Sequence, residues 1–290
     1  MKKKSWFQSK KVSEPKVQRK KKANNISEIK ENDDFFGNQK IKENLQSFYN
    51  NEAKKYAETR KKFRHEEKVI LETITPLFKQ KEKIRVLEFG CGSGRFATLL
   101  NKNFANKFDY IWIDLSDKLL SYANKENPNL TFLQWDITKL IKDFEQESFD
   151  LIVWTSSFQH IPTAKERSFL MKNFYRLLNY EWILLMTNRS LSNWFTKKHR
   201  KAILKARILS WIKFDKWIAH DLLIPRTDDN WNVYKRFYHL FSLKELENLA
   251  TFSWLTLKTL TFIDKNGQYT DNEKSSRSSL FVATKNPFIN

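Results

Sequence analysis

The sequence predicts an α/β protein built on a mostly parallel sheet. From about residue 84 onward, short apolar segments alternate with stretches of helical periodicity, the pattern of βαβ units. A glycine-rich turn, Gly90 to Gly94, directly follows the first apolar segment. Such a turn between a strand and a helix lets backbone N–H groups approach a ligand closely. Both observations indicate a ligand site at the carboxyl ends of the strands.

The predicted core has seven strands, with helices on both faces of the sheet. Before the sheet, the apolar residues between Ile41 and Ala57 recur at helical spacing, which predicts a helix. A second helix is expected over Phe63–Phe78, interrupted at Pro76. A further helix begins after Ser242, where Glu245 occupies the capping-box position. The other helices are expected at Gly94–Lys102, Asp117–Lys125 and Ala164–Leu178. The strands are expected at Ile84–Phe89, Tyr110–Ile113, Leu130–Gln134, Leu151–Trp154, Trp182–Met186, Trp254–Phe262 and Ser279–Thr284.

Two segments fall outside this core pattern. Residues 1–35 are rich in Lys, Ser, Asn and Gln and predict a disordered basic tail, either a nucleic-acid arm or a merely solvated segment. Residues 36–290 are predicted as one domain, ordered from about Asn38. Within it, residues 190–240 form a basic, tryptophan-rich stretch without a strand pattern. This stretch is expected to be a substrate-binding insertion of one or two helices after the fifth strand, with its tryptophans mostly in the core and its lysines facing RNA.

Composition narrows the class of protein. The single cysteine, Cys91, excludes a disulfide framework and a cysteine-based zinc site, which favours a cytoplasmic location; no metal site is predicted. The apolar runs are too short to span a bilayer, so no membrane partner is expected. A net charge of +20 attracts polyanions, nucleic acid first, although a lysine-rich drift in an AT-rich genome accounts for it as well.

The glycine turn does not fit a phosphate cofactor. A dinucleotide fingerprint needs glycine where Arg95 stands, and a P-loop needs a Gly-Lys-Ser/Thr ending. Glu88 would repel a pyrophosphate but suits a cation such as S-adenosylmethionine (SAM), which carries an α-amino group and a sulfonium. Asp114 and Asp136 end the next two strands, where they can reach ribose hydroxyls and an adenine amino group. The predicted cofactor residues are Glu88, Gly90, Cys91, Gly92, Gly94, Asp114, Leu115, Asp136, Ile137 and Thr155.

These motifs resemble those of the class I SAM-dependent methyltransferases. Glu88-x-Gly90-x-Gly92-x-Gly94, Ile113 to Ser116 and Trp135-Asp136 are similar to the family's SAM-binding motifs, and Phe149 to Val153 to its fourth-strand motif. The resemblance implies the Rossmann-like class I methyltransferase fold with SAM as methyl donor. The sequence Leu178 to Glu181 departs from the family's leucine-x-proline-glycine-glycine turn before the fifth strand.

Three further segments resemble the tRNA wobble-uridine carboxymethyl methyltransferases. They are Phe48 to Arg60, Gln159-His160, and Asp221 to Pro225 together with Arg236 to Phe241. This resemblance implies that the acceptor is a carboxylate on a modified uridine in the anticodon loop of tRNA. It also implies a possible small activating protein partner, as in eukaryotic relatives. Arg226 stands where that family has tryptophan.

Methylation of a carboxylate needs alignment more than a strong base. A carboxylate is already nucleophilic at neutral pH, so cations and hydrogen-bond donors that hold it in line suffice. We therefore predict Arg60, His160 and Arg189 as catalytic residues. Tyr56, Arg236, His239, Lys197, Lys198 and Arg200 are predicted to bind the substrate. Two alternatives remain: methylation of a small-molecule carboxylate or other metabolite, and a non-catalytic RNA-binding subunit.

Overall fold

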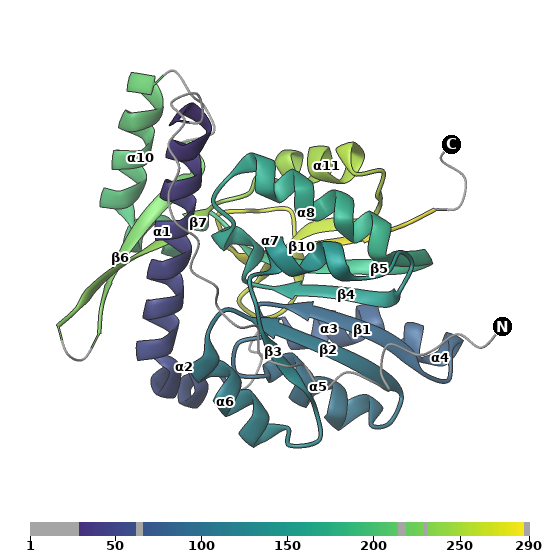
Figure 1. Cartoon of the computed structure of the whole chain (residues 1–290). Coiled ribbons are helices and arrows are strands. Elements are labelled where there is room, and N and C mark those ends of the chain that lie inside the picture. Colours follow the sequence, from purple (N-terminus) through teal and green to yellow (C-terminus); the bar gives the residue numbers. More distant parts are fainter. Residues whose placement is uncertain (1–28, 62–65, 214–218, 229–230, 287–290) are drawn as a thin grey trace. The chain divides into compact units, whose positions relative to one another are not determined.

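The computed structural model describes residues 29–61, 66–213, 219–228 and 231–286 (Figure 1). Most of the predicted basic tail, the first residues of the helix expected from Phe63, and Trp217 lie outside these ranges. Residues 1–36 and 37–290 are separate compact units, and everything below concerns the second of them. Helix α1 (Ile29–Asn51) begins before the predicted onset of order near Asn38.

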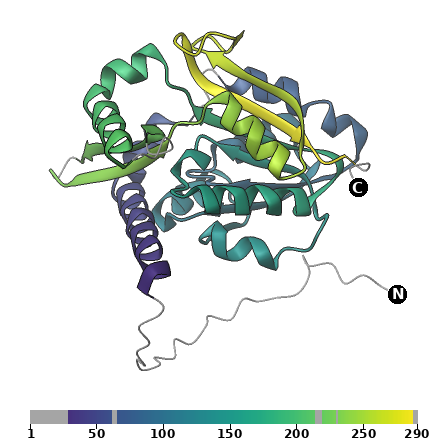
Figure 2. The same ribbon diagram turned by 90° about the horizontal axis from the view of Figure 1, so that it is seen from above.

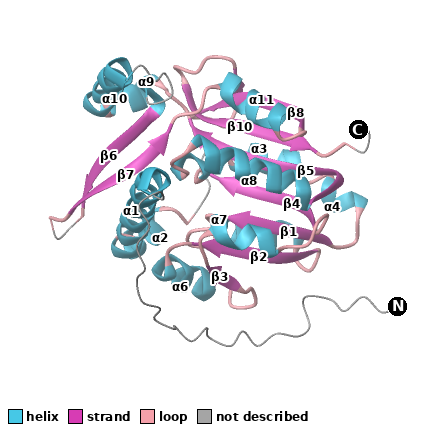
Figure 3. Cartoon of the chain, turned by 45° about the horizontal axis from the view of Figure 1, so that its top comes forward, coloured by secondary structure: helices cyan, strands magenta, loops and turns pink. Residues whose placement is uncertain are grey.

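One mixed sheet forms the core of the larger unit, in the order β3-β2-β1-β4-β5-β10-β8-β9 (Figure 3). The five neighbouring strands from β3 through β2, β1 and β4 to β5 are parallel to one another. Strand β10 lies between β5 and β8 and is antiparallel to both. All seven predicted strands are present, and the two-residue β9 extends the edge beyond them. The strands are β1 (Ile84–Phe89), β2 (Phe108–Asp114), β3 (Phe132–Gln134), β4 (Phe149–Thr155), β5 (Leu178–Arg189), β8 (Thr256–Asp264), β9 (Tyr269–Thr270) and β10 (Ser276–Thr284).

Helices cover both faces of the sheet because its central strands are apolar on both sides, as parallel strands usually are. One hydrophobic cluster packs α8 and α11 on the sheet, and a second packs α3 and α5 on the opposite face (Figure 1). The capping prediction at Ser242 is confirmed, since its hydroxyl accepts from the backbone N–H of Glu245. The helices are α2 (Ala53–Thr59), α3 (Glu67–Ile74), α4 (Leu77–Gln80), α5 (Arg95–Phe104), α6 (Asp117–Glu126), α7 (Ile137–Leu140), α8 (Ala164–Leu177) and α11 (Leu243–Phe252).

The insertion after β5 holds two helices and a β-hairpin. Helices α9 (Asn193–Lys198) and α10 (Arg200–Lys213) precede the antiparallel strands β6 (Asp221–Thr227) and β7 (Val233–His239), and this small sheet stands apart from the main one (Figure 2). The prediction that residues 190–240 contain no strand is therefore wrong. Leu223 is exposed between the buried Leu222 and Ile224. Because this solvent-facing residue is apolar, the sequence lacks the apolar–polar alternation that predicts a strand.

The tryptophans of the insertion that the structure describes are not in its core. Trp194 and Trp211 are exposed, which corrects the prediction for both. The hairpin and the two helices bury smaller side chains instead, among them Phe195, Ile203 and Ala206. None of the helices within the described ranges combines the length and apolar character needed to cross a bilayer.

Candidate active site

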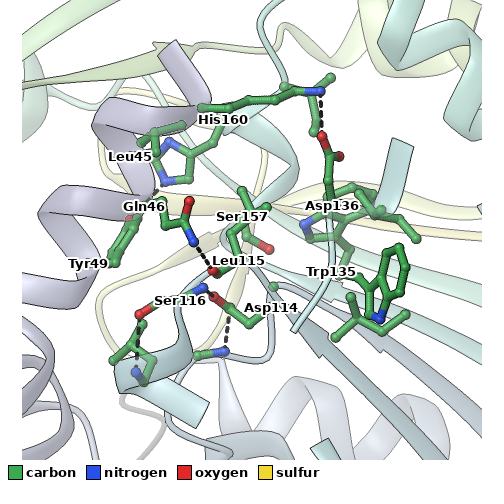
Figure 4. A pocket seen from close by; sticks show the side chains of 18 of the residues that line it. Leu45, Gln46, Tyr49, Asp114, Leu115, Ser116, Trp135, Asp136, Ser157 and His160 are labelled. Atoms are coloured by element: carbon green, nitrogen blue, oxygen red, sulfur yellow. Dashed lines mark hydrogen bonds and ion pairs between the residues drawn. The ribbon is translucent and has the colours of Figure 1, made fainter. Parts of the chain in front are cut away.

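A pocket of about 860 Å³ lies where the carboxyl ends of β1, β2 and β4 meet helix α1 (Figure 4). Its floor comes from the residues that follow these strands, and one wall comes from Leu45, Gln46 and Tyr49 of α1. This is the position at which ligands bind in open α/β sheets. The sequence predicted the floor but not the wall.

The glycine loop turns sharply under this pocket. Gly90, Gly92 and Gly94 have φ angles of 64°, 56° and 76°, in the left-handed region that favours glycine. A Cβ atom on Gly90 would lie 2.3 Å from Oγ of Ser157, so a side chain there would collide with the loop after β4. The loop therefore needs glycine both for its backbone conformation and for its close approach to the neighbouring strand.

Asp114 fixes the shape of the glycine loop from the end of β2. Its Oδ2 atom accepts a hydrogen bond from the backbone N–H of Gly92 and its Oδ1 atom accepts one from Ser116, both at 2.8 Å (Figure 4). Each carboxylate oxygen keeps a second lone pair, and the side chain lines the pocket. Asp114 therefore shapes the loop and retains acceptor capacity for a hydroxyl, as predicted for ribose.

Asp136, predicted to bind adenine, already has partners within the chain. Its Oδ1 atom caps α7 by accepting from the backbone N–H and the hydroxyl of Thr138, and its Oδ2 atom pairs with Nζ of Lys42 at 3.1 Å. Burial raises the pKa of Asp136, but the bonds to Thr138 and Lys42 outweigh burial and lower it. Asp136 is therefore ionised in the pocket, and an incoming amino group would share Oδ2 with Lys42.

A smaller pocket of about 290 Å³ adjoins the first and shares Tyr56, Gly90, Gly92 and Thr155 with it. Glu88 lies at its base, buried and hydrogen-bonded by the hydroxyl of Tyr110 at 3.2 Å. Arg60 lies at the same pocket, with its guanidinium 5.0 Å from the centre of the Tyr56 ring. An acid and a cation together suit the zwitterionic amino-acid end of SAM. Arg60 thus lies at the pocket of Glu88, where it can also meet the cofactor, and its catalytic role stays a prediction.

Taken together, the two pockets fit SAM. The larger one offers Asp114, Trp135 and the ionised Asp136 to a nucleoside, and the smaller one offers Glu88 and Arg60 to an amino acid. The glycine loop separates them at the point where backbone must approach the ligand closely. Cys91 lies in this loop as a buried thiol, and burial raises its pKa well above the usual value, so it packs against the site without being a nucleophile.

We expect SAM binding to release close to one proton from Glu88. Burial raises the pKa of Glu88 to about 8, so the carboxyl is about nine-tenths protonated at pH 7 and must ionise to pair with an ammonium group. Calorimetry at pH 7 in two buffers of different ionisation enthalpy measures this release. The Glu88→Gln variant should release almost none, whereas Glu126→Gln, a surface change, should match the wild type. Equal release by Glu88→Gln and wild type would contradict the assignment.

His160 lies in the larger pocket as a neutral ring. Burial lowers its pKa to about 4. Its Nδ1–H donates to the carbonyl of Phe237 in β7 at 2.7 Å, because a carbonyl can only accept, and its Nε2 atom therefore accepts from the hydroxyl of Tyr49 at 3.1 Å. The ring thus joins α1, the 3₁₀ turn Phe158–His160 and the hairpin. The side of the larger pocket that Tyr49 and His160 line is its acceptor side.

Arg236 stands behind this histidine, on β7. Its guanidinium lies 4.7 Å from the centre of the Phe48 ring and 5.3 Å from that of Tyr238. Its Nε atom is buried and has no hydrogen-bond partner in the part of the chain that the structure describes. Burial lowers the pKa of Arg236, but Tyr238 and Tyr49 outweigh it and raise it, so the group is a cation. Arg236 lines neither pocket, so its charge would act on an anion in the larger pocket from behind Tyr49 and His160.

Seven predicted site residues line neither pocket: Gly94, Arg189, Lys197, Lys198, Arg200, Arg236 and His239. Arg189 donates from Nη1 to the carbonyl of Arg277 in β10, and its backbone N–H donates to Oε1 of Gln159, so its catalytic role stays a prediction. Lys197, Lys198 and Arg200 are exposed on α9 and α10 rather than around the pocket, so their predicted contact with a substrate would have to occur at a separate surface.

His239 is misassigned as a substrate-binding residue. It is fully buried, and its two ring nitrogens contact Oδ1 of Asp221 at 2.6 Å and Oε1 of Glu245 at 2.8 Å. Burial lowers the pKa of His239, but the hydrogen bonds to the two carboxylates outweigh it and raise the pKa. The imidazolium therefore ties the hairpin to α11 and supports the fold.

We expect His239→Gln to lower the free energy of unfolding by about 3 kcal/mol at pH 6, because it removes the cation between two carboxylates and leaves Glu245 with only Arg167 at 4.0 Å. Since the folded pKa lies above the unfolded value near 6.5, this stabilisation is complete below about pH 6.5 and is lost as pH rises through the folded pKa. Denaturant melts at pH 6 and 9 test this, with His220→Gln as the control. A pH-independent difference between His239→Gln and wild type would count against it.

The sequence analysis did not single out Lys42 and Gln46 of α1, and it named Trp135 and Tyr49 only within motifs. Lys42 also pairs with Glu166 at 2.9 Å, and Gln46 donates to the carbonyl of Leu115 at 2.9 Å. The half-exposed Trp135 lines the pocket next to Asp136. Tyr49 follows Phe48 in the Phe48–Arg60 motif, and this pair of aromatic residues on one helix was the signal that could have identified Tyr49 as a site residue.

Comparison with known proteins agrees with this geometry. Residues 86–181 match the family model described as a methyltransferase domain. A SAM-dependent methyltransferase from Methanosarcina mazei superposes with a TM-score of 0.53 at 22% identity, covering 73% of this chain and 97% of that one. A TehB-like SAM-dependent methyltransferase from Corynebacterium glutamicum gives 0.50 at 16% identity, covering 86% and 100%. The chain therefore contains a class I SAM-dependent methyltransferase domain, whose cofactor is SAM.

Among curated proteins, the chain is similar to malonyl-[acyl-carrier protein] O-methyltransferases. The protein of Bacillus cereus is 28% identical over 135 residues, which are 46% of this chain and 46% of that protein. Malonyl-[acyl-carrier protein] O-methyltransferase 1 of Ilyobacter polytropus is 23% identical over 210 residues, which are 71% of this chain and 72% of that protein. The chain thus spans about half the length of the Bacillus relative that it matches.

Proposed function

We propose that this protein is a carboxyl O-methyltransferase, which transfers the methyl group of SAM to the carboxylate of a small acyl compound. The observation that carries this proposal is the partly buried cation of Arg236, which lies behind the larger pocket next to Tyr49 and His160 of its lining and whose Nε donor has no partner in the described part of the chain. A guanidinium held by aromatic rings is the preferred partner of a carboxylate.

The protonation states of these groups suit a carboxylate acceptor. Bound SAM supplies an electrophilic methyl group on a sulfonium. The acceptor oxygen forms the new C–O bond while the C–S bond breaks toward sulfur, so no proton has to move. His160, with a pKa of about 4, is neutral and cannot attract the anion by charge. Arg236 supplies the cation, and the hydroxyl of Tyr56, which lines the pocket, supplies a donor that orients the acceptor.

The relatives support an acyl carboxylate as the acceptor. By their names, the matched curated proteins methylate a malonyl group carried on acyl-carrier protein. Their names do not concern tRNA, so the wobble-uridine carboxylate implied by the sequence motifs is placed second. Both acceptors present a carboxylate, and the site chemistry derived above serves either one.

The experiment is a transfer assay with SAM labelled on its methyl group. Malonyl-coenzyme A, free malonate and total tRNA are offered separately, and the product is treated with alkali, which releases methanol from a methyl ester. We expect alkali-labile label on malonyl-coenzyme A or malonate. Label on nuclease-sensitive tRNA alone would favour the second acceptor. Alkali-stable label on any acceptor would overturn carboxyl methylation.

A further inference from the structure

Helix α10 presents an apolar stripe to solvent. Ile203 and Ala206 bury one side of the helix against the β6–β7 hairpin. On the other side, Leu204, Ile208 and Trp211 follow one another at spacings of four and three residues, which places them on one face. Their exposed fractions are 58%, 49% and 78%, and Ile212 beside them is 58% exposed. Large apolar side chains at helical spacing on an exposed face mark a binding surface.

Cations flank this stripe on both sides. Arg200 and Arg207 fall on one side of it in the helical projection and Lys201 and Lys205 on the other, and all four are exposed. The sequence from Leu191 to Lys213 contains no Asp or Glu. Next to the helix, Trp194 lies 4.9 Å from the charged groups of both Lys198 and Arg277, which adds a further aromatic with cations. The ligand of this face must therefore be anionic and must also offer apolar contact.

We propose that the exposed face of α10 binds the surface of a membrane that contains anionic lipids. An interfacial helix places its Trp, Leu and Ile side chains at the boundary of the acyl chains, while Lys and Arg reach the headgroup phosphates. The stems of these long side chains can lie along apolar surface with their charges in water. A fluid bilayer also needs no matching groove on the protein.

Two other occupants fit less well. A second copy of the chain would bring the cationic rows of one α10 against those of the other without an intervening acid, which costs energy. RNA would pair its phosphates with the cations but would leave Leu204 and Ile208 facing a polar backbone, since RNA recognition relies on flat aromatic stacking.

This surface is independent of the proposed acceptor. The expectation that no membrane partner exists rested on the absence of a spanning segment, and an interfacial helix does not span. The hairpin on which α10 packs also carries Arg236 and Tyr238. Docking of α10 would therefore hold the acceptor side of the pocket near the bilayer.

Vesicle flotation of the full chain tests the proposal. Vesicles of phosphatidylcholine alone are compared with vesicles in which about a third of the lipid is phosphatidylglycerol. We expect the chain to float with the anionic vesicles and not with the neutral ones. Ile208→Glu and Trp211→Glu should each weaken binding at least about tenfold. Phe252→Glu, which changes a side chain 71% exposed on α11, should bind as the wild type does.

Three results would overturn the proposal. The first is absence of flotation with anionic vesicles. The second is an equal loss of binding in Phe252→Glu, which would indicate a nonspecific charge effect. The third is full binding by Ile208→Glu and Trp211→Glu, which would leave only a diffuse attraction of the +20 chain. If vesicles never bind and the same two substitutions weaken the binding of tRNA to the chain, the face is an RNA surface instead.

Discussion

The Asp114→Ala variant is expected to bind SAM at least about a hundredfold more weakly than the wild type. The Asp114 carboxylate accepts from the backbone N–H groups of Gly92 and Ser116 and lines the larger pocket. Its loss leaves two donors without a partner and removes an acceptor for the ribose. Hydrogen bonds to a charged group contribute about 1.5–3 kcal/mol each, and about 2.7 kcal/mol is a hundredfold in Kd.

Titration calorimetry with SAM measures this loss, and Asp109→Ala provides the matched control. Asp109 lies on the same strand but at its opposite end, where it pairs with Lys83 on the surface. Circular dichroism must show that both variants are folded. If Asp114→Ala bound SAM as tightly as Asp109→Ala, the pocket at the end of β2 would not be the cofactor site.

The Arg236→Met variant is expected to lower kcat/KM for a carboxylate acceptor by about a hundredfold while the Kd for SAM changes less than about twofold. Methionine fills the space between Phe48 and Tyr238 but removes the cation and the free Nε donor. Loss of one well-oriented guanidinium contact to an anion costs about 2–3 kcal/mol. Arg236→Lys should recover part of the rate, since lysine keeps the charge without the planar fork.

Arg226→Met is the control for this experiment. Arg226 lies on the paired strand β6 and is exposed, so the change removes an arginine from the same hairpin without touching the acceptor side. Steady-state rates with a saturating SAM concentration isolate the acceptor step. An unchanged kcat/KM in Arg236→Met, or a parallel loss of SAM affinity, would refute the assignment of Arg236 to the acceptor carboxylate.

Much of the fold and the centre of the site follow from short-range patterns. The apolar segment before Gly90 predicts a buried strand, and the three glycines predict a turn that only they tolerate, as their positive φ angles show. Asp114 ends the next strand, and parallel strands bring their carboxyl ends together. The class I fold predicted on this basis is confirmed by the sheet order and by the structural neighbours.

The positions of other residues depend on contacts between distant parts of the chain. His160 was placed near the pocket from its position after β4, but only the approach of β7 and α1 supplies the Phe237 carbonyl and the Tyr49 hydroxyl that keep its ring neutral. Lys42 reaches Asp136 across the sheet edge in the same way. No local pattern encodes such pairs, so the roles of these residues stay predictions until tested.

By itself, the sequence determined the parallel sheet, the glycine loop and the acids at the strand ends, because periodicity and glycine geometry act within a few residues. Only the tertiary structure decided which charged residues serve the pocket. Arg236 is held between aromatic rings with a free donor, whereas His239, three residues away, is neutralised by Asp221 and Glu245. On β7 these two side chains point to opposite sides, and what each side packs against is set by the rest of the fold.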